Sequence, residues 1–132
     1  MMTKKLAFRI IFFFYLAAVL VLCFGNFQNA PSVTKSILGI PTDKLVHFVM
    51  FFPFPILAFL AFDSFTENWR TSLLFVTASF IAGILLALLT EWGQAHLTTW
   101  RHGDPKDLLA DIVALFISSI LVFIIDVRKQ KK

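Results

Sequence analysis

The stretch SLLFVTASFIAGILLALLT, residues 72–90, contains no acidic, basic or histidine residue. A helix needs about 20 consecutive, mostly apolar residues to cross the hydrocarbon core of a bilayer. This stretch has that length, and its serines and threonines are uncharged. It therefore predicts a helix that spans a membrane.

Three other stretches have a similar length and composition. The expected spans are residues 6–24, 45–62, 72–90 and 108–125. Of the 132 residues, 58% are hydrophobic and only 15% are charged. A soluble domain averages about 45–50% apolar residues and needs polar surface to cover its core. The sequence thus predicts one all-α membrane domain over residues 1–132, a four-transmembrane-helix bundle.

The first span follows Lys4 and Lys5, as the apolar segment of a secretory signal peptide would. Its apolar run is longer than such a segment usually is, and no A-x-A cleavage site follows it. We therefore expect residues 6–24 to remain as a helix. The single cysteine, Cys23, excludes an internal disulfide and is expected to be a small buried hydrophobe.

The second span contains two prolines, Pro53 and Pro55. Proline has no backbone N–H and kinks or breaks a helix. Membrane helices tolerate this when neighbouring groups satisfy the freed carbonyls. The sequence predicts a kink or a local break near residues 50–55.

Basic residues gather near the two chain ends, at Lys4, Lys5, Arg9, Arg128, Lys129, Lys131 and Lys132. Lysine and arginine next to spans favour the cytoplasmic side, so we expect both termini in the cytoplasm. This charge lies beside apolar spans and forms no patch interleaved with aromatic residues, so no nucleic-acid partner is expected. The sequence thus predicts a multi-pass membrane protein whose partner is the lipid bilayer.

With this topology the connections at residues 25–44 and 91–107 face outward, and the link at 63–71 faces inward. The first connection is expected to be irregular, with a short interfacial segment at 33–38. The second span begins, the third ends and the fourth begins on the outward side. Polar residues at those three span ends should therefore meet at one membrane face.

Nine polar residues occupy these span ends. They are Asp43, Lys44, His47, Glu91, Gln94, Arg101, Asp104, Asp107 and Asp111. Residues four apart share a helix face, as do Asp43 with His47 and Asp107 with Asp111. Ionisable groups inside a span normally face the bundle interior or water and pair with one another. The pattern leaves two interpretations open, a functional site or a buried ion-pair network.

Small residues line the third and fourth spans below these polar groups, at Ser79, Gly83 and Ala87 and at Ala110, Ala114 and Ser118. Such stripes let membrane helices approach closely, so we expect these two spans to pack along them. Asp104 before Pro105 has the pattern of a helix N-cap, and Asp43 could serve the same role on the second span. Lys44 and Lys106 are expected to be solvated.

A histidine with two or three carboxylates could bind a divalent metal or perform acid–base chemistry. Arg101 could hold a carboxylate or phosphate with two parallel hydrogen bonds. The sequence has no glycine-rich phosphate loop and no clear nucleophile motif, and it names no cofactor.

The order and spacing of these residues resemble the VanZ-like family of small bacterial membrane proteins. The resemblance runs over roughly residues 42–122 and rests on the recurrent positions Asp43, Lys44, His47, Glu91, Gln94, Arg101, Asp107 and Asp111. The family commonly has asparagine where this chain has Asp111, and glycines where it has Ala114 and Ser118. The archetype of the family is linked to resistance to the glycopeptide teicoplanin. The resemblance therefore implies a multi-pass cell-envelope protein of the bacterial inner (cytoplasmic) membrane, whose outer-face site recognises a cell-wall precursor or a glycopeptide.

Two other functions remain open at this point. The same residues could serve a membrane-embedded hydrolase or transferase that acts on a lipid-linked or cell-wall substrate. They could also form an ion-pair clamp in a structural or partner-binding subunit. A transporter is less favoured, because no ionisable residue lies near the middle of a predicted span, where transport sites usually sit.

Overall fold

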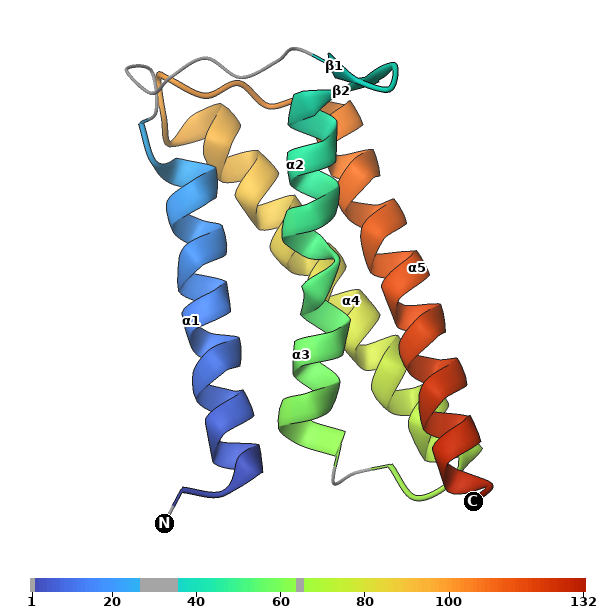
Figure 1. Ribbon diagram of the computed structural model, residues 1–132. Helices are drawn as coiled ribbons and strands as arrows, with labels where there is room; N and C mark the ends of the chain where they lie inside the picture. Colours follow the sequence, from blue (N-terminus) through green and yellow to red (C-terminus); the bar gives the residue numbers. More distant parts are fainter. Residues whose placement is uncertain (1, 27–35, 64–65) are drawn as a thin grey trace.

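The computed structural model describes residues 2–26, 36–63 and 66–132, and within them the chain forms a bundle of helices (Figure 1). The helices are α1 (Lys4–Phe24), α2 (Thr42–Phe51), α3 (Pro53–Phe62), α4 (Trp69–His96) and α5 (Pro105–Gln130). Because α2 and α3 together make one span, the described residues contain four helical segments long and apolar enough to cross a membrane. The predicted all-α bundle of four spans is confirmed. The helices extend past the predicted bounds, because polar residues continue the helical turns beyond each apolar run.

Two short strands precede α2. Strands β1 (Ser36–Ile37) and β2 (Ile40–Pro41) pair antiparallel around Leu38 and Gly39, whose φ angles are 53° and 81°. Two central residues with positive φ are typical of the tight turn that joins neighbouring strands. The expected interfacial segment at residues 33–38 lies partly outside the described residues, and residues 36–38 of it belong to this hairpin rather than to an irregular loop.

The predicted break in the second span is present. Helix α2 ends at Phe51 and α3 begins at Pro53, with Phe52 between them. The hydroxyl of Tyr15 on α1 donates a hydrogen bond to the carbonyl oxygen of Met50 at this point. This bond links α1 to the broken region, whereas the carbonyls that lose their helical donors are those four residues before each proline.

Helices α4 and α5 pack through small residues, as expected. Ala87, Ala114 and Ser118 are fully buried. A Cβ atom on Gly83 would lie 2.6 Å from Cδ2 of Leu115 and 3.2 Å from Cδ1 of Phe54. Since real Cβ contacts are not that short, this close approach of the helices depends on glycine.

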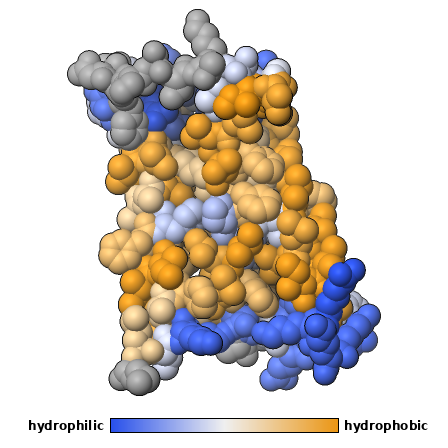
Figure 2. All heavy atoms as spheres, viewed as in Figure 1, coloured by the Kyte–Doolittle hydropathy of each residue, from blue (hydrophilic) through white to orange (hydrophobic). Residues whose placement is uncertain are grey.

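The two ends of the bundle are polar, and the middle is mostly apolar with a small, weakly polar patch on the face shown (Figure 2). Both termini lie at one end, and the β-hairpin lies at the other (Figure 1). We call the second end the network end: there α1 and α4 finish and α2 and α5 begin. Large apolar side chains along the middle are exposed, among them Phe14, Leu74 and Leu89. Such a belt suits contact with lipid chains.

Helix α1 is attached to the bundle near the termini. Lys5 forms an ion pair with Asp63, and Nε of Arg9 donates to the carbonyl oxygen of Ala61 at 3.2 Å. The Arg9 guanidinium also lies 5.3 Å from the centre of the Phe62 ring. Phe12 packs into the core further along the helix. The terminal half of α1 is therefore fixed against α3.

Candidate functional site

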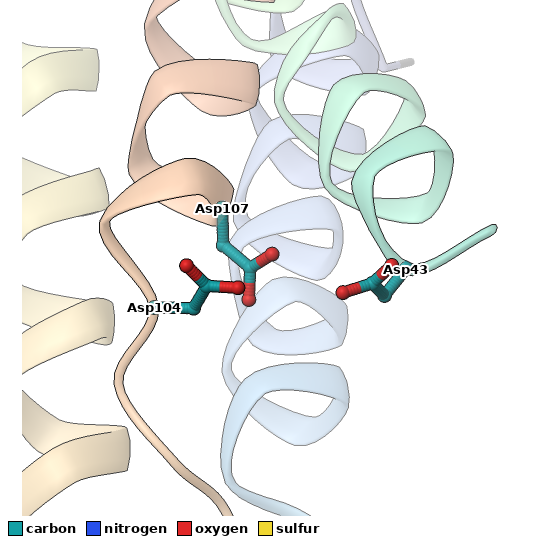
Figure 3. A group of neighbouring side chains, drawn as sticks. All are labelled: Asp43, Asp104 and Asp107. Carbon is teal, nitrogen blue, oxygen red and sulfur yellow. The ribbon is translucent and has the colours of Figure 1, made fainter. Parts of the chain in front are cut away.

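Lys44 stands at the centre of a cluster of carboxylates at the network end. Its ammonium donates to Oδ2 of Asp43 and to Oδ2 of Asp104, each at 2.6 Å, and to Oδ1 of Asp107. Figure 3 shows the carboxylates of Asp104 and Asp107 together at the start of α5, with that of Asp43 pointing toward them from α2. The side chain of Lys44 is only 16% exposed. Lys44 thereby ties the first turn of α2 to that of α5.

This arrangement corrects two sequence-based expectations. Lys44 is not solvated, because three carboxylates replace water around its ammonium. Asp43 is not an N-cap: Pro41 holds that position, and the Asp43 side chain pairs with Lys44 instead. The N-cap role of Asp104 is confirmed, since its side chain accepts a hydrogen bond from the backbone N–H of Lys106. Asp104 thus caps α5 through one oxygen and binds Lys44 through the other.

His47 lies one turn deeper, between two carboxylates of α5. Its Nδ1 is 2.9 Å from Oδ1 of Asp111, and its Nε2 is 3.4 Å from Oδ2 of Asp107. His47 is buried and Asp111 is 0% exposed. Oδ2 of Asp111 has no hydrogen-bond partner among the described residues. The predicted i, i+4 pairs Asp43–His47 and Asp107–Asp111 therefore do face each other across α2 and α5.

We call these six residues the ionic network: Asp43, Lys44, His47, Asp104, Asp107 and Asp111. A buried ion pair stabilises a fold only when its members are well matched and further hydrogen bonds satisfy them. Here each carboxylate contacts a lysine or histidine nitrogen. The network is therefore able to hold α2 against α5 without a bound ligand.

Glu91 occupies a different position, next to the loop that precedes α5. Its Oε1 accepts a hydrogen bond from the backbone N–H of Asp104, while its Oε2 is buried without a partner among the described residues. Glu91 and Asp104 also line a groove of about 350 Å³ between the end of α4 and the start of α5. The rest of this lining is mostly apolar and includes Leu88, Trp92 and Leu108. His47 does not belong to it.

Gln94 and Arg101 point away from the network, toward the end of α1. Nε2 of Gln94 donates to the carbonyl oxygen of Cys23 at 3.0 Å, and an Arg101 guanidinium nitrogen donates to that of Leu22 at 2.6 Å. The indole N–H of Trp100 donates to the carbonyl oxygen of Phe24 at 3.1 Å. The last carbonyls of a helix have no partner within the helix. These three side chains donate hydrogen bonds to three consecutive carbonyls at the end of α1, and we call them the α1 cap.

The candidate residues thus divide into three groups although all lie at one end. Asp43, Lys44, His47, Asp107 and Asp111 meet in the ionic network, Glu91 lines the groove, and Gln94 and Arg101 belong to the α1 cap. Arg101, which was expected to hold a phosphate or carboxylate, donates to the carbonyl oxygen of Leu22. Asp104 belongs to both the network and the groove.

Sequence reasoning missed two further residues. Trp100 was not expected to contact α1, and no local pattern indicates that contact. Asp126 is buried near the opposite end of α5, where Oδ2 accepts a hydrogen bond from Nε2 of Gln130 at 3.3 Å. Asp126 lies one residue past the predicted fourth span, residues 108–125. The spacing of Asp111, Leu115, Val122 and Asp126 on one helix face would have indicated its burial.

Three carboxylates have the spacing of a metal site. One oxygen each of Asp43, Asp104 and Asp107 lies within 4.8 Å of the others. Hard cations such as Mg²⁺ favour such oxygen ligands. However, the Lys44 ammonium hydrogen-bonds all three carboxylates, and His47 is not part of this set. A metal ion would have to displace Lys44, so the lysine acts as the cation of this cluster.

The pH dependence of stability should report the contact between Lys44 and Asp104. The hydrogen bond from Lys44 lowers the pKa of the Asp104 carboxyl below its ordinary value of 3.8. A carboxylate with a lowered pKa in the folded state stabilises the fold above its unfolded-state pKa, and this contribution is lost as the pH falls through the folded-state pKa. Asp104→Asn keeps an N-cap residue and removes the charge.

We therefore expect Asp104→Asn to be less stable than the unmodified protein at neutral pH. The difference should shrink as the pH is lowered below 3.8. Detergent-micelle unfolding of both proteins over a pH series measures it. A difference that stays constant down to strongly acidic pH would show that the lysine contact contributes nothing.

Comparison of the chain with protein-family models, with curated proteins and with solved structures yields no match. The fold and the contacts above define its class: a multi-pass, all-α membrane protein with an ionic network at the end opposite its termini.

Proposed function

We propose that this chain is a VanZ-like integral membrane protein of the bacterial cell envelope. In this proposal the termini lie in the cytoplasm, and the network end lies at the outer surface of the inner membrane. There the protein contributes to glycopeptide resistance by recognising a cell-wall precursor or the glycopeptide itself.

One observation carries the proposal. Two segments that are about 60 residues apart, one with Asp43, Lys44 and His47 and the other with Asp107 and Asp111, form one connected network. These residues are also five of the eight positions on which the resemblance to the VanZ-like family rests. A single structural unit therefore accounts for the order and spacing of these residues. Beside it, Glu91 lines the groove of about 350 Å³.

The orientation can be tested with reporters at the carboxyl end. Basic residues at both termini favour the cytoplasmic side. We expect a carboxyl-terminal green fluorescent protein to be fluorescent and a carboxyl-terminal alkaline phosphatase, which is active only outside the cytoplasm, to be inactive. The reverse result would place the network end in the cytoplasm and remove the proposed contact with the cell wall.

The resistance role can be tested in a glycopeptide-susceptible bacterium. Expression of the protein should raise the teicoplanin concentration that stops growth. Glu91→Ala should abolish that increase while the amount of protein in the membrane stays the same. The matched control is Glu67→Ala, since Glu67 is an exposed glutamate at the other end of the bundle. No increase with the unmodified protein, or equal resistance with Glu91→Ala, would refute the role.

A structural or partner-binding subunit is the second candidate, and the position of Lys44 among three carboxylates favours it. If the ionic network serves only as a clamp between α2 and α5, neutralising its members should lower stability without changing resistance in protein that still reaches the membrane. A hydrolase or transferase has less support. Both ring nitrogens of His47 face carboxylates, and the imidazole does not line the groove.

A further inference from the structure

The groove at the network end combines an apolar lining with a carboxylate. Leu88 and Trp92 border it from α4, and Leu108 borders it from α5. Leu88 lies about one helical turn below Trp92, which is exposed and has the amphipathic ring favoured at membrane surfaces. The volume of the groove, about 350 Å³, is in the range of small-molecule sites. The groove therefore suits an amphiphile with its chain toward Leu88 and its head group toward Glu91.

Charge decides which head group fits. Oε1 of Glu91 already accepts a hydrogen bond from the loop, whereas Oε2 is buried and has no partner in the described part of the chain. Lys44 donates to three other carboxylates and not to this one. The charged residues of the groove lining, Glu91 and Asp104, are both acidic. A ligand that brings a positively charged hydrogen-bond donor would therefore match the charge of the groove.

We propose that this groove binds a phospholipid with a primary ammonium head group, such as phosphatidylethanolamine, and that the ammonium donates to Glu91. A choline head group carries the same charge but has no N–H to donate. An anionic head group without an amine would face Glu91 and Asp104 with the wrong sign. The inference depends on the proposed position of the network end at a membrane surface, and it is independent of the glycopeptide role.

The experiment uses the full chain, purified in detergent micelles. Phosphatidylethanolamine, phosphatidylcholine and phosphatidylglycerol with identical acyl chains are added in turn, and the retained lipid is counted by native mass spectrometry. A hydrogen bond to a charged group discriminates by about tenfold. We expect phosphatidylethanolamine to be retained about tenfold more than either other lipid. Equal retention of the ethanolamine and choline lipids would overturn the proposal.

Two variants locate the site. Glu91→Gln keeps an oxygen for the loop N–H and removes the charge, so it should reduce retention of phosphatidylethanolamine to that of phosphatidylcholine. Glu67→Gln, at the other end of the bundle, should change nothing. Leu88→Trp narrows the apolar part of the groove and should reduce the retention of all three lipids. Unchanged selectivity in Glu91→Gln would assign the lipid to another surface.

The two proposals fail separately. Loss of the resistance effect with lipid selectivity intact would refute the glycopeptide role alone. Resistance that depends on Glu91, without preference for the ethanolamine lipid, would refute the lipid site alone.

Discussion

Replacing Lys44 by methionine should lower the free energy of unfolding by about 3 kcal/mol. The substitution leaves the apolar stem in place but removes the cation shared by Asp43, Asp104 and Asp107. Asp43 and Asp104 would then lack this cation at the junction of α2 and α5, and Asp107 would keep only Nε2 of His47 at 3.4 Å. Because part of the cluster is exposed, the loss should fall at the lower end of the range for a broken buried ion pair.

Lys106→Met is the matched control. Lys106 lies in the first turn of α5, also at the network end. It is exposed and forms no side-chain ion pair among the described residues. Its replacement should change the free energy of unfolding by about 0.5 kcal/mol or less. Titration of both variants with dodecyl sulfate in mixed micelles, followed by circular dichroism, measures the difference. Similar losses for the two variants would mean that the ionic network does not stabilise the fold.

A second substitution separates charge repulsion from lost packing. In the Lys44→Met background, Asp107→Asn removes one of the facing carboxylates and should recover part of the lost stability. A double-mutant cycle isolates this interaction when the single variants make no new contacts. No recovery would indicate that the lysine stem, and not its charge, holds the helices together.

Removing the α1 cap should release the end of α1 from the bundle. Gln94→Leu and Arg101→Met together leave the carbonyls of Cys23 and Leu22 without their side-chain donors. Leaving the buried carbonyl of Cys23 unsatisfied costs about 1–3 kcal/mol, and losing the exposed hydrogen bond from Arg101 costs about 1 kcal/mol, so the pair should cost about 3 kcal/mol. That corresponds to roughly a hundredfold increase in the population with the end of α1 detached.

Cys23 can report the detachment of α1, because it is the single cysteine of the chain and is buried beside Met50. A water-soluble maleimide should label Cys23 slowly in the unmodified protein and roughly a hundred times faster in the double variant. The control is Trp92→Phe, which removes an indole N–H from the same end without removing a hydrogen bond to α1 in the described residues. Equal labelling rates for the three proteins would show that the cap does not fix α1.

Local features of the sequence predicted much of the fold. The lengths of the apolar runs predicted four spans, because a bilayer requires about 20 apolar residues in each. Pro53 and Pro55 predicted the break between α2 and α3, since proline removes backbone donors whatever surrounds it. Asp104 before Pro105 predicted the start of α5 for an equally local reason.

The grouping of polar residues at one end also followed from the sequence, whereas their partners did not. Because consecutive spans alternate in direction, Asp43, Glu91 and Asp107 come to the same end whatever the lateral order of the helices. The contact of Gln94 with α1 depends on which helices are neighbours and how each is rotated. The hydropathy of the sequence predicts neither which helices are neighbours nor how each helix is rotated, because lipid chains are as apolar as the side chains of the core.

The sequence by itself thus determined the spans, the break and the end at which the charged residues gather, because these depend on local composition and on the thickness of a bilayer. The tertiary structure alone decided that Lys44 lies between three carboxylates, that Arg101 caps α1 and that Glu91 lines a groove. These roles depend on helix rotation and on the reach of each side chain, which only the packed bundle fixes.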